Sequence, residues 1–337
     1  MRLYRLPHAA GIDSLTAAEA ETPVAGRGQA LIRMRAASLN YRDLMIINGR
    51  AARGAPPANL VPLSDGAGEV VAVGPEVTRV KPGDRVAACF MQSWIGGPID
   101  PDDAASSMGG AIDGVLSEYC LFDQNGLVHL PPHLSFEQGA TLPCAGVTAW
   151  NALFGGQTLF PGDSVLVLGT GGVSVFALQF AHGMGARVIC TSSSDAKLER
   201  VRALGASDTI NYTRTPDWQD EVRRLTGKAG VDLVAEVGGA GTLARSMQAT
   251  RAGGRIAVIG VLTGRAEIDP GPILFRRLCL QGILVGSRRM FETMNRAIEA
   301  LSLQPVIGRR FGFDEVPAAL SHLKSGGHFG KVVISAE

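Results

Sequence analysis

The segment Asp163-Ser-Val-Leu-Val-Leu168, followed directly by Gly169-Thr-Gly-Gly-Val-Ser174, decides the fold of this 337-residue chain. Val165 to Leu168 form the apolar run of a buried parallel strand, and Val175-Phe-Ala-Leu-Gln-Phe-Ala181 has the apolar spacing of a helix. A strand, a glycine turn and a helix in this order are the context in which a glycine-rich turn predicts a dinucleotide site. Ser174 stands where the third glycine of the G-x-G-x-x-G pattern is expected.

The glycine turn predicts where the phosphates of a dinucleotide would lie. Gly169 permits the tight turn, and Gly171 lets the backbone approach a pyrophosphate without a Cβ in the way. Free N–H groups at the start of the following helix then face the phosphates. We therefore expect the phosphates to contact Gly169, Thr170, Gly171, Gly172 and Val173.

The second strand, Ala186-Arg-Val-Ile-Cys-Thr191, indicates which nicotinamide cofactor is bound. An NAD site would place Asp or Glu at the end of this strand, to accept hydrogen bonds from the ribose 2′-hydroxyl. The sequence continues instead with Ser192, Ser193 and Ser194, and Lys197 follows shortly after. Hydroxyls and a cation suit a 2′-phosphate, so we expect NADP(H) to bind at Ser192, Ser193 and Lys197. Ser193 or Ser194 is also suited to cap the next helix, and the two roles are compatible.

Strands and helices alternate through the middle of the chain and predict a doubly wound parallel sheet. The expected strands lie near residues 164–168, 186–191, 208–211, 231–236, 254–260 and 278–285, and the expected helices near 172–184, 195–204, 217–226 and 241–251. Residues 1–123 are β-rich, and the segment after Arg288 loses the repeat, so we expect it to rejoin the first domain. The predicted domains are therefore 1–123 with 289–337, and 124–288.

Composition excludes several classes of protein. The net charge of +1 gives no electrostatic basis for binding nucleic acid or an acidic membrane. The five cysteines include no C-x-x-C pair, so we expect buried free thiols and a reducing, cytoplasmic location. Residues 164–186 lack charged side chains, but the glycines divide this stretch into a buried strand and a buried helix. No secretory signal peptide is visible at the N-terminus.

Five strings together resemble the medium-chain dehydrogenase/reductase superfamily along essentially the whole chain. They are Asn40-Tyr-Arg-Asp-Leu44, Leu63-Ser-Asp-Gly-Ala-Gly-Glu-Val-Val-Ala-Val-Gly74, Lys81-Pro-Gly-Asp-Arg85, Pro143-Cys-Ala-Gly-Val-Thr-Ala-Trp150 and Phe329-Gly-Lys-Val-Val333. The resemblance implies an α/β protein with a β-rich GroES-like catalytic domain and a Rossmann domain that binds the dinucleotide.

The zinc ligands of the alcohol dehydrogenases in this superfamily are not matched here. The positions of their Cys, His-Glu and second Cys hold Asn40, Ser64-Asp65 and Cys144, and only Cys144 agrees. The four-cysteine cluster of the structural zinc is also missing from the sequence. Zinc needs three good protein ligands at a catalytic site and four at a structural one, so we expect no metal.

The sequence is then most similar to the zinc-free quinone oxidoreductase and enoyl reductase branch, which implies roles for further residues. Ser193, Lys197 and Tyr212 would surround the 2′-phosphate, and Lys331 would bind the pyrophosphate. Thr148 and Asn40 would lie beside the nicotinamide, and the backbone of Gly260, Val261, Val285 and Gly286 would contact it. A strand-end aromatic that covers the sheet remains an alternative for Tyr212, as does a solvated lysine for Lys331.

This branch implies NADPH-dependent reduction of quinones or of activated C=C bonds in small enones. Hydride transfer leaves charge on the substrate oxygen, and Tyr41 and Arg42 beside Asn40 are the candidate donors, with Tyr41 favoured. A packing role for Tyr41 remains open, and Asp43 and Asp65 suit ion pairs or helix caps. The alternatives are an alcohol dehydrogenase or carbonyl reductase, and a non-catalytic NADPH-binding module. We also expect a homodimer through the apolar edge strand 278–285.

Overall fold

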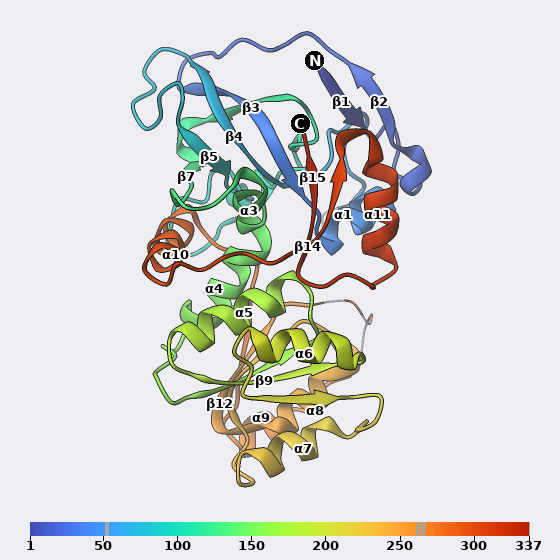
Figure 1. The fold of residues 1–337 in the computed structure, drawn as a ribbon, viewed down its shortest axis with the longest axis vertical. Coiled ribbons are helices and arrows are strands. Elements are labelled where there is room, and N and C mark those ends of the chain that lie inside the picture. The colour runs from blue at the N-terminus through green and yellow to red at the C-terminus, as the bar shows by residue number, and fades with distance from the viewer. Residues whose placement is uncertain (51–53, 261, 263, 265–266, 337) are drawn as a thin grey trace. The chain divides into compact units, whose positions relative to one another are not determined.

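The computed structural model describes residues 1–50, 54–260, 262, 264 and 267–336 and divides the chain into two compact units. The first unit comprises Met1–Val147 and Gly286–Glu337, and the second comprises Thr148–Val285 (Figure 1). Val261, one of the expected cofactor residues, lies outside the described residues.

The second unit contains the predicted parallel sheet. Its six strands are β8 (Ser164–Leu168), β9 (Arg187–Ser192), β10 (Asp208–Asn211), β11 (Val231–Glu236), β12 (Thr250–Val258) and β13 (Cys279–Gly282). They lie in the order β10-β9-β8-β11-β12-β13, and every pairing is parallel. This is the strand order of a doubly wound dinucleotide-binding sheet, with its topological switch point between β8 and β11. The predicted fold class is confirmed.

Helices cover the sheet because parallel strands must be buried on both faces. They include α4 (Val147–Phe154), α5 (Gly172–Gly183), α6 (Asp195–Ala203), α7 (Trp218–Leu225), α8 (Ala240–Ala249) and α9 (Gly271–Phe275). Phe176 and Phe180 on α5 stack with ring centroids 5.9 Å apart, and Trp150 of α4 meets Phe180 edge-on at 5.4 Å. These aromatic contacts fix α4 against α5.

The first unit is built on a largely antiparallel sheet. Its path runs β14 (Ile307–Gly312), β15 (Lys331–Ser335), β3 (Gln29–Ser38), β4 (Asp65–Val73), β5 (Arg85–Ala88) and β7 (Leu127–His129). β6 (Tyr119–Asp123) also pairs with β3, and β1 (Arg2–Arg5) forms a separate ladder with β2 (Thr16–Glu19). The helices of this unit include α1 (Tyr41–Ile47), α2 (Pro101–Ala105), α3 (Phe136–Ala140), α10 (Arg288–Ala300) and α11 (Val316–Lys324).

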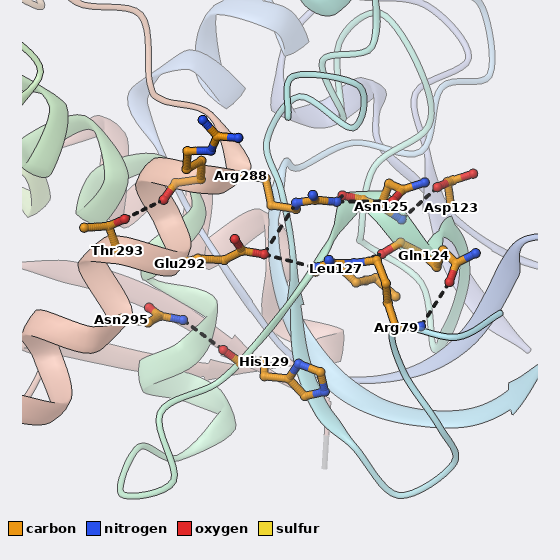
Figure 2. A network of polar contacts seen from close by, with 11 residues as sticks. Arg79, Asp123, Gln124, Asn125, Leu127, His129, Arg288, Glu292, Thr293 and Asn295 are labelled. Carbon is orange, nitrogen blue, oxygen red and sulfur yellow. Dashed lines mark hydrogen bonds and ion pairs between the residues drawn. The ribbon is translucent and has the colours of Figure 1, made fainter. Parts of the chain in front are cut away.

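The C-terminal segment rejoins the first unit through a polar network around α10 (Figure 2). Glu292 accepts a hydrogen bond of 2.9 Å from Arg79 and lies 3.4 Å from the guanidinium of Arg288. Arg288 also donates to the carbonyl of Asn125 at 3.0 Å, and the next turn is held through Asn295, whose amide donates to the His129 carbonyl at 2.8 Å. These contacts attach α10 to the segment that leads into and through β7.

The unit boundary differs from the predicted domain boundary. Residues 124–147, which the sequence analysis assigned to the second domain, pack with the first unit. The reason is that β7 pairs with β5, and that α3 packs against β3 and β4. The second crossing, between Val285 and Gly286, lies three residues before the predicted one.

The edge strand β13 is shorter than the predicted strand 278–285. It ends at Gly282, and Val285 has a φ of 51°, which extended backbone cannot accommodate. Cys279 on this strand is exposed, against the expectation that the cysteines are buried, whereas Cys89, Cys120 and Cys190 are buried. Among the described residues, no helix is long and apolar enough to cross a membrane.

Candidate functional site

The glycine turn between β8 and α5 has the geometry that phosphate binding needs. Gly169 has a φ of 72°, a value that favours glycine, and Gly171 precedes the helix without a side-chain cap. The first intrahelical bond is donated by Val175 to the Gly171 carbonyl at 3.0 Å, so the N–H groups of residues 172–174 lie before it. This arrangement fits an anion at the start of α5.

Ser174 makes a contact that glycine could not make at this position. Its buried hydroxyl donates a hydrogen bond of 2.7 Å to the carbonyl of Leu168, the last residue of β8. The departure from the G-x-G-x-x-G pattern therefore leaves helix and strand closely joined.

The end of β9 brings together the residues expected at a 2′-phosphate. Ser192 is buried, Ser193 is exposed, and Lys197 lies in the first turn of α6. Tyr212, just after β10, is placed beside them because its N–H donates to the Ser192 carbonyl at 3.1 Å. Ser194 caps α6 by accepting from the Lys197 N–H at 3.4 Å, so the capping alternative is also realised.

Burial and the neighbouring Arg200 lower the pKa of Lys197. A second cation beside a partly buried ammonium favours an anionic ligand at this end of the sheet.

Two candidate nicotinamide contacts in the second unit lie at special backbone positions. Gly260 follows β12, where an added Cβ would come 1.6 Å from the Val237 carbonyl oxygen, so close packing of the backbone requires glycine there. Val285 is β-branched yet has a φ of 51°, which is a strained conformation. Strain of this kind persists only where surrounding contacts hold it.

Asn151, which sequence reasoning missed, holds Val285. Its buried side chain donates Nδ2–H to the Val285 carbonyl at 2.7 Å. Thr148, the expected nicotinamide contact, is buried one turn earlier on α4, and positions three apart share one face of a helix. The sequence shows that Asn151 lies on the same helix face as Thr148. It does not show that Asn151 contacts Val285, because the two residues are 134 positions apart.

Glu236 at the end of β11 is a second residue that sequence reasoning missed. It is fully buried and accepts hydrogen bonds from the N–H groups of Gly238 and Gly239 at 2.9 and 3.0 Å. The hydroxyls of Thr242 and Ser246 also donate to it. Its carboxylate thus closes the turn between β11 and α8 at the ligand-facing edge of the sheet, which is a structural role.

The expected catalytic residues of the first unit lie at the start of α1. Asn40 is its N-cap, and its N–H donates to the Asp43 carboxylate at 2.7 Å. Arg42 donates to the Met108 carbonyl at 2.9 Å and lies over the Phe90 ring, 4.4 Å from its centroid. Tyr41 is 49% exposed, so its phenol is open to a ligand, whereas the Arg42 guanidinium is held by protein contacts.

Asp43 and Asp65 have the structural roles expected of them. Burial raises the pKa of Asp43 to about 6, although Arg42 beside it acts in the opposite direction. Burial likewise raises the pKa of Asp65, and Lys331 beside it limits the rise. Asp43 caps α1, and Asp65 pairs with a cation.

That cation, Lys331, has other partners than those expected. Its ammonium donates to the Leu39 carbonyl and to Asn40 Oδ1, both at 2.6 Å, and lies 4.0 Å from Asp65 Oδ2. Lys331 is only 3% exposed, and all three contacts lie within the first unit. Its contact with the pyrophosphate stays a prediction. Gly286, the first residue after the crossing, packs so closely that an added Cβ would come 2.5 Å from Val147.

The residues at the positions of the family's zinc ligands do not fit zinc. The Cys144 N–H donates to Asp65 Oδ2 at 3.1 Å, and the Ser64 hydroxyl donates to Asp65 Oδ1 at 2.8 Å. Burial, with the nearby Asp65 carboxylate, raises the pKa of the Cys144 thiol to about 12. A protonated thiol, an amide and a carboxylate already paired with an ammonium make a poor zinc donor set. Among the described residues, no three His, Cys, Asp or Glu side chains cluster as metal ligands.

Two family models match this chain. The model described as alcohol dehydrogenase GroES-like domain matches residues 26–132, and the model described as zinc-binding dehydrogenase matches residues 172–300.

Individual relatives match the chain over nearly its whole length. A zinc-type alcohol dehydrogenase-like protein of Schizosaccharomyces pombe is 43% identical, over 97% of this chain and 96% of its own. The human quinone oxidoreductase is 28% identical, over 93% of this chain and 90% of its own.

Two solved structures have the same fold throughout. A putative alcohol dehydrogenase from Sinorhizobium meliloti 1021 superposes with a TM-score of 0.93 at 44% identity, covering 99% of this chain and 98% of its own. An NAD-dependent alcohol dehydrogenase superposes with a TM-score of 0.91 at 34% identity, covering 100% of both chains.

The buried ammonium generates a stability prediction. Lys331→Met should lower the free energy of unfolding by about 3–5 kcal/mol, because Asp65 would stay buried without its cation. In Lys331→Met/Asp65→Asn both charges are gone, and we expect a smaller loss than in the single variant. Urea unfolding followed by circular dichroism measures both. A single variant within about 1 kcal/mol of the wild type would contradict the assigned ion pair.

Proposed function

The chain belongs to the medium-chain dehydrogenase/reductase superfamily of oxidoreductases, and on that premise we propose that it reduces quinones or activated C=C bonds of small enones with NADPH. The observation that carries the proposal is the end of β9, where hydroxyls and Lys197 stand in place of a carboxylate. A strand end of this kind favours the 2′-phosphate of NADPH over the free 2′-hydroxyl of NADH.

The second unit has the residues to hold the cofactor. Residues 169–173 would take the pyrophosphate, and Ser192, Ser193, Lys197 and Tyr212 would surround the 2′-phosphate. Thr148, with Val285 held in place by Asn151, would contact the nicotinamide. NADPH, when bound, supplies a hydride to an electron-poor carbon of the substrate.

Tyr41 would stabilise the substrate oxygen. An enone that accepts hydride at its β-carbon becomes an enolate, and a donor at that oxygen lowers the barrier. The exposed phenol of Tyr41 suits this role and can also supply a proton, directly or through water. Asn40 and Arg42 flank Tyr41 in sequence, and Lys331 donates a hydrogen bond to the side-chain oxygen of Asn40. The mechanism proposed here uses no metal, because the residues at the zinc positions do not fit one.

Alcohol–carbonyl interconversion is the second candidate function. The names of the Schizosaccharomyces pombe relative and of both solved structures favour it. A zinc-dependent form of this reaction is disfavoured, because Asn40, Asp65 and Cys144 are poor zinc ligands. A non-catalytic NADPH-binding module is the third candidate. Turnover with defined acceptors separates the three.

A cofactor titration tests the 2′-phosphate site. The wild type should bind NADPH more tightly than NADH. Lys197→Ala should raise the Kd for NADPH about tenfold or more and change that for NADH less than twofold, because one charge-assisted hydrogen bond is lost. Quenching of tryptophan fluorescence measures both constants. Lys228→Ala, at an exposed lysine elsewhere in the second unit, is the matched control. Equal losses for the two cofactors would remove the assignment.

A turnover assay tests the reaction and its independence from metal. NADPH should be oxidised on addition of 9,10-phenanthrenequinone or 2-cyclohexenone, and prior dialysis against EDTA should leave the rate unchanged. The rate is followed at 340 nm, with zinc measured by elemental analysis of the same sample. Oxidation of simple alcohols with NADP⁺ that is lost with stoichiometric zinc would establish the second candidate, and tight NADPH binding without any turnover the third.

We also propose that two chains pair through the edge strand β13. This strand ends the six-stranded sheet, and exposed apolar side chains lie near it in sequence: Leu274 (70% exposed), Phe275 (85%) and Leu284 (54%). An unpaired edge beside large exposed apolar residues is typical of an interface between copies.

The pairing can be tested at Phe275. Phe275→Asp should convert a dimer to a monomer, because a charge would be buried in the interface. Light scattering coupled to size-exclusion chromatography gives the mass directly. Phe160→Asp, at another exposed phenylalanine of the second unit, should leave the mass unchanged. A wild-type chain that elutes only as a monomer would refute the pairing.

A further inference from the structure

A carboxylate stands beside the expected 2′-phosphate position. Asp195 is the first residue of α6, directly after the cap Ser194 and two residues from both Ser193 and Lys197. An uncompensated negative charge at this point would repel a 2′-phosphate, which carries nearly two negative charges. If NADPH binds here, the negative charge of Asp195 must be compensated by another group.

Arg214 neutralises that carboxylate. Its guanidinium donates to both oxygens of Asp195, at 2.5 and 2.7 Å, in the two-point geometry that arginine forms with carboxylates. Both side chains are more than half exposed, 67% and 55%, so the pair lies at the surface, where a cofactor phosphate would also lie.

Asn211 fixes the direction in which Asp195 points. The buried Asn211 accepts from the N–H and the hydroxyl of Thr213 through Oδ1, at 3.0 and 2.6 Å. Its Nδ2 is therefore turned to donate to Asp195 at 2.8 Å. Hydrogen bonds from Asn211 and Arg214 lower the pKa of Asp195, and the charge of Arg202 adds to this effect, so the carboxylate is charged at neutral pH. Arg214 is the cation that is hydrogen-bonded to it.

We propose that Arg214 is a specificity-determining residue that masks Asp195 and so permits NADPH to bind. This inference rests on the proposed NADPH site and adds to it a residue outside the hydroxyl and lysine set. Arg214 follows Tyr212 by two residues, so the loop after β10 would contribute both a side chain at the 2′-phosphate and the mask for the carboxylate of α6.

Three variants test the mask by their effect on the ratio of the Kd values for NADPH and NADH. Arg214→Ala should raise the NADPH constant about tenfold and leave the NADH constant within twofold, because the exposed carboxylate repels only the 2′-phosphate. Arg214→Ala/Asp195→Asn should return the ratio to within about twofold of the wild type. Asp195→Asn alone should bind NADPH at least as tightly as the wild type. The effect of Arg214→Ala should shrink in 0.5 M salt.

A matched control exists on α7. Arg224 makes the same two-point contact with Glu221, at 2.7 and 2.6 Å, and Arg224→Ala should not change the ratio. Thermal unfolding of every variant checks that the fold is kept.

Two outcomes would overturn the mask. If the double variant stays as weak as Arg214→Ala, the arginine binds the phosphate itself. If Arg214→Ala weakens both cofactors equally, the ion pair is only structural. A wild type that binds NADH more tightly than NADPH would contradict the proposed NADPH preference. That result is distinct from failure of the mask, which predicts only how Arg214→Ala changes the ratio of the two Kd values.

Discussion

The ammonium of Lys331 joins parts of the first unit that are far apart in sequence. Its hydrogen bonds to Leu39 and Asn40 span 292 and 291 positions, and its ion pair reaches the start of β4. A buried ammonium and a buried carboxylate are each costly alone, so the residues around them are tightly constrained together. In the relatives that bind zinc, cysteine and histidine surround a metal at the matching positions. In this chain the ammonium of Lys331 lies beside two of these positions, Asn40 and Asp65.

In the second unit, two carboxylates near the proposed cofactor site are compensated by other groups of the protein. The proposed cofactor site lies at the ends of parallel strands, where helix N-termini and backbone amides supply partial positive charge. Glu236 is fully buried there but is saturated by donors, so it adds order to the edge of the sheet and leaves ligand binding to its neighbours. Asp195 is exposed and paired with Arg214. Both carboxylates are thus compensated within the protein.

The predictable part of the structure is the part that depends on near neighbours in sequence. The apolar run of Val165–Leu168 and the glycines after it predict β8 and α5 to within a residue, because strand burial and helix periodicity are local properties. Ser194 was recognisable as one of two candidate caps of α6 for the same reason. The partners of Lys331, the strain at Val285 and its support by Asn151 were not predictable, because each depends on chain segments more than a hundred positions apart. The unit boundary at residue 147 was not predictable either, because it follows from the pairing of β7 with β5, a tertiary contact that no local pattern indicates.

The division of the chain has a consequence for its synthesis on the ribosome. The second unit is one continuous segment, whereas the first is interrupted by it and needs β15, which lies inside its sheet between β14 and β3. The Rossmann-like unit can fold as soon as it emerges, but residues 36–38 at the end of β3 lack one strand partner until β15 has been made. During that interval the backbone hydrogen-bonding groups of residues 36–38 are exposed to pairing with other chains. Nascent chains stalled before residue 331 are therefore the form of this protein that most needs a chaperone.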